Sequence, residues 1–357
     1  MKQSIRIGRI AGIDIYVHFT LFIVLIIFSY ALYITPHPFG FYGLKYSSNI
    51  RAILSVISAI SLFLAVLLHE LSHSLIGKRM GVKVKGIILF IFGGVALLEK
   101  IPEEPRSEIK IAVAGPLMSI FLASVSLIIY LSKIDIISEL FLTFSIYNFA
   151  LAFFNLIPAF PLDGGRILRA LIARKTGFLK ATKIAAEVGK ILAFLIGILG
   201  LFFNPWLILI AFFIYMGASE EEKSVIVENI LKNVTVREIM TPSPITVTPA
   251  MKVSEVLDMM LRYKHLGYPV VDDGDIVGII TLKDIMNASP DDEVEKLMSR
   301  DVLMISPSAN AIEALQLMNE RNIGRLPVVE NGKLVGIVSR TDLIRTLEIL
   351  GTKSREV

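Results

Sequence analysis

Long apolar runs occupy most of the first 218 residues and set the expected architecture. A helix needs about 17 to 25 mostly apolar residues to cross a bilayer. Six runs reach or approach that length, near residues 17–34, 53–76, 109–131, 139–157, 184–203 and 205–218. The last two are separated only by Phe203-Asn204-Pro205, which predicts a tight turn between antiparallel helices. The pattern therefore predicts about six transmembrane helices.

A further apolar stretch, Val84 to Leu98, is too short for a comfortable span. It is rich in β-branched and aromatic residues, and Gly93-Gly94 interrupts it. These features predict strand or short re-entrant β structure that is buried against protein.

The pattern changes after Ala218, where a charged helical linker from Ser219 to Asn233 leads into a segment with the hydropathy of a soluble α/β domain. This last third repeats itself with a period of 58 residues. Matching positions include Met240 and Met298, Pro249 and Pro307, and segments 277–285 and 335–343. Each unit is predicted to form a strand, an amphipathic helix, a two-strand hairpin and a closing helix. The hairpins should turn at Asp273-Gly274 and Asn331-Gly332.

The expected fold is thus a polytopic α-helical membrane domain with a short re-entrant β segment, followed by an α/β tandem repeat. The expected domains are residues 1–218, a linker at 219–233, a first repeat at 234–290 and a second at 291–357. Lysine and arginine cluster before the first apolar run, after the second, and between the fourth and fifth. By the positive-inside rule these segments face the cytosol, so both termini and the repeats are expected to be cytoplasmic.

The amino-acid composition limits the class of protein and the kinds of metal ligand that the chain can use. The chain has 357 residues, of which 54% are hydrophobic and 19% charged, and this excludes a wholly soluble protein. It contains no cysteine, which excludes disulfides and thiolate zinc ligands, so any metal site must use His, Asp or Glu. The net charge of +4 reflects loop lysines and arginines rather than a nucleic-acid partner.

The second apolar run contains His69-Glu70-Leu71-Ser72-His73. A charged residue at that depth costs about 2.5 to 3.5 kcal/mol, so these side chains need a shared function. On a helix the two histidines lie one turn apart on one face and can meet one metal ion. Glu70, one step round, could hold the water of that ion and take its proton. The alternative is a helix with two histidines by chance.

A third ligand is expected from Asp163, in the segment Asn155 to Arg166 at the end of the fourth run. Two prolines should stop the helix there, and Gly164-Gly165 should allow a tight turn. The alternative is an interfacial loop in which Asp163 caps the next helix. The second and fourth runs point the same way across the membrane, which places His73 and Asp163 on the same side and favours a ligand. His18 competes for this role, but it starts the first run at the interface, where a histidine needs no metal.

These two motifs, in this order, resemble the site-2 protease family of intramembrane zinc metalloproteases. The resemblance covers about residues 1–218 and includes the segments 12–20, 92–94 and 114–116. It implies that zinc binds to His69, His73 and Asp163 and that Glu70 is the general base. It also implies that Asn155 holds substrate or stabilises the developing oxyanion, and that residues 92–94 pair with an extended substrate strand.

The tandem units resemble a pair of CBS domains over about residues 234–347. The resemblance implies an adenine nucleotide in the cleft between the repeats. Asp284 and Asp342 would then hold ribose hydroxyls, Thr281 and Ser339 would lie near the phosphates, and the adenine pocket would be lined by Pro269-Val270 and Pro327-Val328. The alternative is a structural dimerisation module whose aspartates only cap helices.

Together these features predict an intramembrane zinc metalloprotease that cleaves in or near a transmembrane helix of a membrane-bound substrate. The linker Ser219 to Asn233 is expected to transmit the nucleotide state of the CBS pair, and a homodimer through that pair is expected. A CBS-gated transporter is the first alternative, but outside the two motifs the apolar runs offer few polar residues to line a path. A catalytically inactive relative is the second, and the intact Glu70 argues against it.

Overall fold

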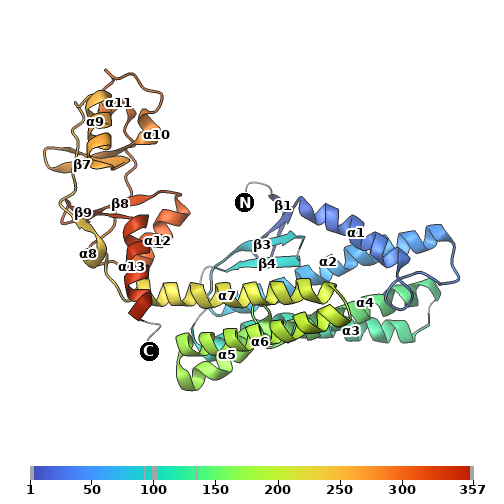
Figure 1. The fold of residues 1–357 in the computed structure, drawn as a ribbon. Helices are drawn as coiled ribbons and strands as arrows, with labels where there is room; N and C mark the ends of the chain where they lie inside the picture. The colour runs from blue at the N-terminus through green and yellow to red at the C-terminus, as the bar shows by residue number, and fades with distance from the viewer. Residues whose placement is uncertain (1–3, 92, 99–102, 134, 354–357) are drawn as a thin grey trace. The chain divides into compact units, whose positions relative to one another are not determined.

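The computed structural model of the chain describes residues 4–91, 93–98, 103–133 and 135–353 (Figure 1). The chain divides into two compact units, Met1–Lys223 and Ser224–Val357. Helix α7, Trp206–Lys232, is continuous across the division.

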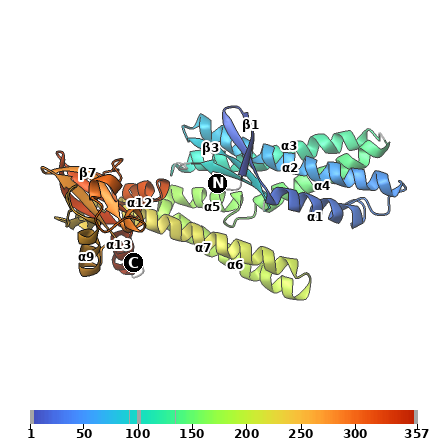
Figure 2. The same ribbon diagram turned by 90° about the horizontal axis from the view of Figure 1, so that it is seen from above.

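The first unit is built mainly from helices. They are α1 (Thr20–Ile34), α2 (Ser48–Arg79), α3 (Pro105–Leu131), α4 (Asp135–Asn155), α5 (Asp163–Thr176), α6 (Phe178–Phe202) and the first part of α7. Helices α2, α3 and α4 pack side by side, as the two views of the molecule show (Figures 1 and 2). Helix α5 packs against both α3 and α6, which places its start beside α3.

Four helices within the described part of the chain are long and apolar enough to cross a membrane: Ser48–Arg79, Pro105–Leu131, Ile137–Asn155 and Phe178–Phe202. Each of the six predicted runs lies mainly on a helix, but neither α1 nor α7 is among these four. Helix α1 has only 15 residues, which span about 22 Å against a hydrocarbon core of about 30 Å. The count of six spans therefore stays a prediction. Large apolar side chains such as Ile26, Phe121, Phe153, Phe194 and Phe202 are exposed on the outer faces, as contact with lipid requires.

A four-stranded sheet packs against these helices. Its strands are β1 (Ser4–Ile10), β2 (Ile13–His18), β3 (Val84–Phe90) and β4 (Gly93–Leu98), in the order β1-β2-β3-β4. Strands β2 and β3 are parallel and the other two pairs are antiparallel. The stretch predicted to be strand or re-entrant structure is thus the β3-β4 hairpin, and Phe92 lies outside the described residues. Strand β4 is an edge of the sheet.

The expectation that the first membrane helix begins near Val17 was wrong. Val17 and His18 end strand β2, and α1 begins at Thr20. Strand β2 alternates buried and half-buried residues, with Ile13, Ile15 and Val17 facing the core. This period-two pattern merges without a break into the apolar residues of α1, so hydropathy alone could not separate the two elements.

The second unit contains two repeats. The first has α8 (Val236–Ile239), β5 (Thr241–Pro242), α9 (Val253–Tyr263), β6 (Gly267–Asp272), β7 (Asp275–Thr281) and α10 (Leu282–Ile285). The second has α11 (Val294–Leu297), α12 (Ala311–Glu320), β8 (Arg325–Glu330), β9 (Lys333–Ser339) and α13 (Arg340–Lys353). The sheets have the orders β6-β7 and β5-β9-β8.

The predicted hairpins are confirmed. Asp273 and Gly274 have φ values of 48° and 92°, and Asn331 and Gly332 have 51° and 82°, the left-handed values that a tight β-hairpin turn needs. The strand expected at the start of each unit is reduced to a single bridge, from Val247 in the first and from Ile305 in the second.

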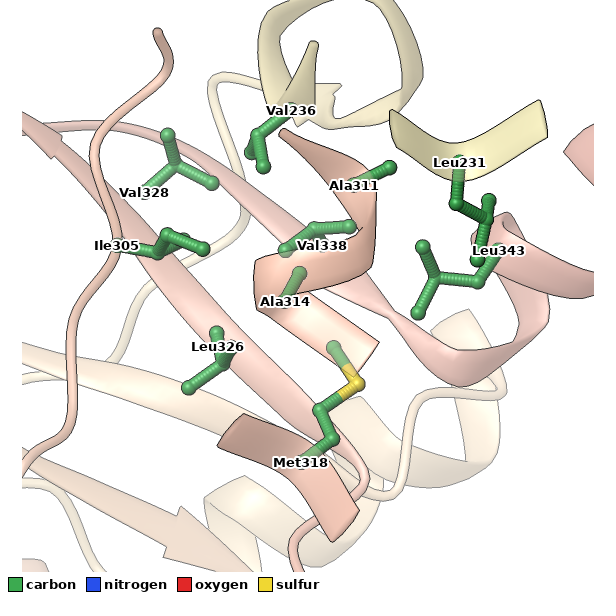
Figure 3. Close-up of a cluster of buried hydrophobic side chains, with 10 residues drawn as sticks. All are labelled: Leu231, Val236, Ile305, Ala311, Ala314, Met318, Leu326, Val328, Val338 and Leu343. Carbon is green, nitrogen blue, oxygen red and sulfur yellow. The ribbon is translucent and has the colours of Figure 1, made fainter. Parts of the chain in front are cut away.

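The core of the second repeat also holds the end of helix α7. Leu231 is fully buried there with Val236, Val338 and Leu343 (Figure 3). The helix that carries the predicted linker is therefore anchored in a hydrophobic core at its carboxyl end.

Candidate metal centre

Helix α2 presents both histidines of the HExxH motif to one point. His69 and His73 are buried, and their rings lie edge to face with centroids 4.9 Å apart. The Nε2 atoms lie 3.3 and 3.1 Å from Oδ2 of Asp163. The ligand atoms of all three residues lie within 4.8 Å of one another. The structure thus brings together the three residues that the sequence predicted as metal ligands.

Asp163 reaches this point as the first residue of helix α5. The N-cap position belongs to Leu162, and no side chain caps the helix. The alternative role of Asp163 as an N-cap is therefore wrong, and its carboxylate faces the histidines instead.

The predicted tight turn at Gly164-Gly165 is also wrong, because both glycines lie in the first turn of α5. A Cβ on Gly164 would lie 2.2 Å from the carbonyl oxygen of Ile157, and one on Gly165 would lie 2.6 Å from the backbone of Ala159. The glycines let the preceding loop pack directly on the helix. The glycines determine the position of Asp163 by allowing this close contact between loop and helix, and not by forming a turn.

Helix α3 orients both imidazoles from the other side. The Nδ1 atom of His69 is hydrogen-bonded to Oγ of Ser119 at 2.9 Å, and Nδ1 of His73 donates to the carbonyl oxygen of Ile111 at 2.7 Å. Such partners fix the orientation of each ring, so that Nε2 is directed at a metal, and the Ile111 carbonyl, which only accepts, places the proton of His73 on Nδ1. The sequence carried no signal for Ser119 or Ile111, because a serine and a main-chain carbonyl are common in any helix.

Gly115 of the same helix keeps a space open beside the two rings. A Cβ at this position would lie 2.2 Å from Nε2 of His73 and 2.5 Å from Nε2 of His69. Two imidazole nitrogens and one carboxylate oxygen form a common zinc set that leaves a fourth position open. The donor atoms and the space beside them fit a zinc ion.

Glu70 lies next to the edge of the sheet. A Cβ on Gly94 would lie 2.6 Å from Cγ of Glu70, so only glycine allows strand β4 to come this close. Beside Gly93 an apolar cavity of about 210 Å³ lies among α1, α2, α4 and β4. Its lining includes Phe28, Leu62, Val66, Gly93, Tyr147 and Asn148.

Two other predicted residues lie outside this group. Asn155 ends helix α4, and its Nδ2 donates to the carbonyl oxygen of Leu151 at 2.9 Å. His18 ends strand β2, and its Nδ1 is hydrogen-bonded to Oγ1 of Thr20 at 2.9 Å. Among the described residues, the group that could hold a metal ion consists of His69, His73 and Asp163, without His18.

The residues predicted to hold a nucleotide form two equivalent pairs. Oδ2 of Asp284 accepts hydrogen bonds from Oγ1 and the main-chain N–H of Thr281, at 2.6 and 2.8 Å. Oδ2 of Asp342 accepts the same two bonds from Ser339, at the same distances. Each aspartate thus engages one carboxylate oxygen at the start of its helix. Arg325 links the repeats by donating from Nη1 to the carbonyl oxygen of Gly267 at 2.8 Å.

Two family models match the chain. The model of peptidase family M50 matches residues 57–134 and 130–196, and the model of the CBS domain matches residues 236–291 and 294–349. A zinc metalloprotease of Methanocaldococcus jannaschii is 43% identical over 99% of this chain and 98% of its own length.

Two solved structures are also similar. A site-2 protease from Methanocaldococcus jannaschii is 40% identical, with a TM-score of 0.43 over 61% of this chain and 95% of its own. CBSX2 in complex with AMP is 30% identical, with a TM-score of 0.31 over 33% of this chain and 99% of its own.

Proposed function

The chain belongs to peptidase family M50, the site-2 proteases, as a zinc metalloprotease with a tandem CBS pair, and on this premise we propose that it cleaves within or beside a transmembrane helix of a membrane-bound substrate. The observation that carries the proposal is the convergence of His69, His73 and Asp163 beside Gly115. The histidines and Gly115 lie on α2 and α3, two helices long and apolar enough to span a bilayer. The catalytic group would lie at membrane depth, where only a membrane-embedded substrate can reach it.

In the proposed mechanism His69, His73 and Asp163 hold one zinc ion. When bound, zinc supplies Lewis acidity and lowers the pKa of a water to about 7. Glu70 accepts the proton of the attacking water and later passes it to the leaving amine. Ser119 and the carbonyl of Ile111 keep the imidazoles in place during the cycle.

The substrate must unwind locally, because a helical peptide surrounds its own carbonyl carbons with side chains. The free edge of β4 offers main-chain groups to an extended segment, as in β-strand addition. Gly93 belongs both to this edge and to the lining of the apolar cavity. A substrate strand paired here would pass Glu70 and place an apolar side chain in the cavity.

Asn155 is proposed to hold the substrate or to stabilise the developing oxyanion. Its Nδ2 is engaged with Leu151 within helix α4. A donor role therefore requires the amide to exchange this bond for one to the substrate, a change of rotamer that a residue at a helix end can make.

Regulation is proposed to come from an adenine nucleotide in the CBS pair, with Thr281, Asp284, Ser339 and Asp342 as its contacts. Helix α7 supports this coupling. Its carboxyl end is anchored by Leu231 in the core of the second repeat (Figure 3). Farther up the same helix, a Cβ on Gly217 would lie 2.4 Å from Pro161, two residues before Asp163. A shift of α7 would therefore move the loop that contains Pro161 and leads to the proposed metal ligand Asp163.

The proposed setting is the cell membrane, crossed several times, with both termini and the CBS pair in the cytoplasm. This orientation rests on the lysine and arginine distribution of the sequence. The lipid bilayer and a transmembrane protein substrate are the proposed partners, and a homodimer through the CBS pair is the proposed assembly.

The test uses the purified full-length chain in phospholipid vesicles with a pool of single-span membrane proteins, and cleavage products are identified by mass spectrometry. Wild type should contain about one zinc per chain and produce cuts within membrane segments. Glu70→Gln should keep the zinc and lose the cuts, whereas Glu187→Gln, at an exposed position on α6, should behave as wild type. Zinc without cleavage in wild type would favour an inactive relative, and zinc-dependent ion flux would favour a transporter.

A further inference from the structure

A buried arginine lies close behind the metal ligand Asp163. Arg169, on helix α5, is only 2% exposed. Its Nε donates to Oε1 of Glu108 on α3 at 2.8 Å, and its Nη1 donates to Oε1 of Glu221 on α7 at 2.6 Å. Glu108 is 1% exposed, while the side chain of Glu221 is one-third exposed. One guanidinium therefore joins three helices.

The same guanidinium lies against two aromatic rings. Its Cζ is 5.0 Å from the ring centroid of Phe160 and 4.6 Å from that of Phe178, within cation–π distance. Phe160 belongs to the loop that delivers Asp163, three residues before it. Phe178 begins helix α6. Arg169 thus contacts α3, α6, α7 and the loop that precedes α5.

Stability alone does not explain this arrangement. Removing an arginine and a glutamate from water costs free energy that their attraction returns only in part, and packed apolar side chains are often as stable in such a place. Two helices that meet only through apolar side chains can slide past each other. The planar guanidinium fixes the direction of its hydrogen bonds, because its N–H donors form a rigid fork. The ion pairs of Arg169 therefore fix the position of α5 relative to α3 and α7.

That position decides the geometry of the metal ligands. Glu108 stands one helical turn before Ile111, whose carbonyl oxygen holds His73. Asp163 stands six residues before Arg169 on α5. The Arg169–Glu108 pair therefore ties the segment of α3 that orients His73 to the helix that begins with Asp163. In this arrangement Nε2 of His73 and Oδ2 of Asp163 lie 3.1 Å apart.

We propose that Arg169 is a positioning residue of the metal centre: through Glu108 it holds Asp163 in register with His69 and His73, and through Glu221 it links this register to helix α7. The proposal rests on the proposed function in one respect, that these three residues bind zinc. Arg169 itself contacts neither the metal nor the substrate. Arg169 acts by holding His69, His73 and Asp163 in their metal-binding arrangement before the metal binds.

The experiment measures the zinc Kd of the full-length chain in detergent by competition with a fluorescent chelator. Arg169→Met, which keeps much of the side-chain length and removes the ion pairs, should raise Kd about tenfold or more, the usual effect of losing an outer-shell partner. Arg169→Lys should recover part of the affinity, because it restores the charge without the fork. Lys190→Met is the matched control, because Lys190 pairs with Glu187 and with Glu222 of α7, and its Kd should match wild type.

A folded Arg169→Met protein, with wild-type circular dichroism, whose Kd lies within twofold of wild type would overturn the proposal. If Arg169→Met does not fold, Glu221→Gln decides, because it changes one charge at a partly exposed site. It should raise Kd about tenfold, the lower end of the effect expected for such partners, and an unchanged Kd there refutes the proposal. A wild-type chain that binds no zinc refutes both this proposal and the proposed function, whereas zinc binding that is insensitive to Arg169 refutes only the positioning role.

Discussion

The Nδ1 atom of His73 donates to the carbonyl oxygen of Ile111 at 2.7 Å, and this hydrogen bond directs Nε2 of the same ring at Asp163. His73 therefore has a main-chain partner, which a substitution cannot remove, whereas His69 has a side-chain partner, Ser119, which a substitution can remove. Helix α3 carries none of the three proposed metal ligands, yet it holds the rings of two of them through hydrogen bonds. Variants on α3 therefore test the metal centre without altering its donor atoms.

Ser119→Ala should weaken zinc binding about tenfold, because His69 loses the hydrogen bond that fixes its ring. Chelator competition on the purified protein measures this change. Ser145→Ala is the control, because Ser145 is also buried and loses a hydrogen bond of 2.8 Å, in this case to Ala123. Both variants should lose about 1 to 3 kcal/mol of stability. Equal zinc affinities in the two variants would argue that Ser119 has no role beyond folding.

Gly115→Ala should reduce zinc content to a small fraction of wild type, with an affinity loss on the order of 100-fold. The new methyl group would lie 2.2 Å from His73 Nε2, in the space that the metal needs. Elemental analysis of the purified chain measures the effect. Gly197→Ala is the matched control, because its Cβ would make an ordinary contact of 3.5 Å with Ala211. A Gly115→Ala protein with a full zinc content would show that the ion lies elsewhere.

His18→Ala should leave zinc content and affinity unchanged, since His18 is hydrogen-bonded to Thr20 and lies outside the group of converging ligand atoms. The measurement is the same chelator competition, with His69→Ala as the positive control that loses the metal. Loss of zinc in His18→Ala would mean that the fourth position is taken by this histidine rather than left open for water and substrate.

The parts of this protein that sequence could predict are those in which side-chain type carries the signal. Two histidines four residues apart and an aspartate after a proline-rich helix end need no neighbours to be noticed. Gly115 entered only as part of segment 114–116 of the family resemblance, without a role, and the carbonyl of Ile111 was not noticed. The close approach of a glycine to a histidine, or of a backbone oxygen to an imidazole, is visible only in the folded chain.

The misread elements have equally local causes. The last two residues of strand β2, Val17 and His18, were assigned to a membrane helix because the strand is only six residues long and runs into an apolar helix. Gly164 and Gly165 suggested a turn because glycine serves both in turns and in close packing. The difference depends on the loop residues Ile157 and Ala159, which contact them only in the folded chain. Tertiary contact, and not local preference, decided these positions.

Asp342→Ala should lower the affinity of the full-length chain for AMP or ATP by about tenfold, if its carboxylate holds a ribose hydroxyl in addition to its bonds with Ser339; removing a charged hydrogen-bond partner costs roughly 1.5 to 3 kcal/mol. Isothermal titration calorimetry measures the affinity. Asp284→Ala gives the equivalent test in the first repeat.

Glu238→Ala separates nucleotide binding from helix capping. Oε2 of Glu238 accepts from the main-chain N–H and Oγ1 of Thr235, the arrangement that Asp342 makes with Ser339. Each variant should lose about 1 kcal/mol of stability as its cap is removed, but only the aspartate variants should lose nucleotide affinity. If all three bind nucleotide equally well, or the wild-type chain binds none, the aspartates serve only as caps and the CBS pair is a structural module.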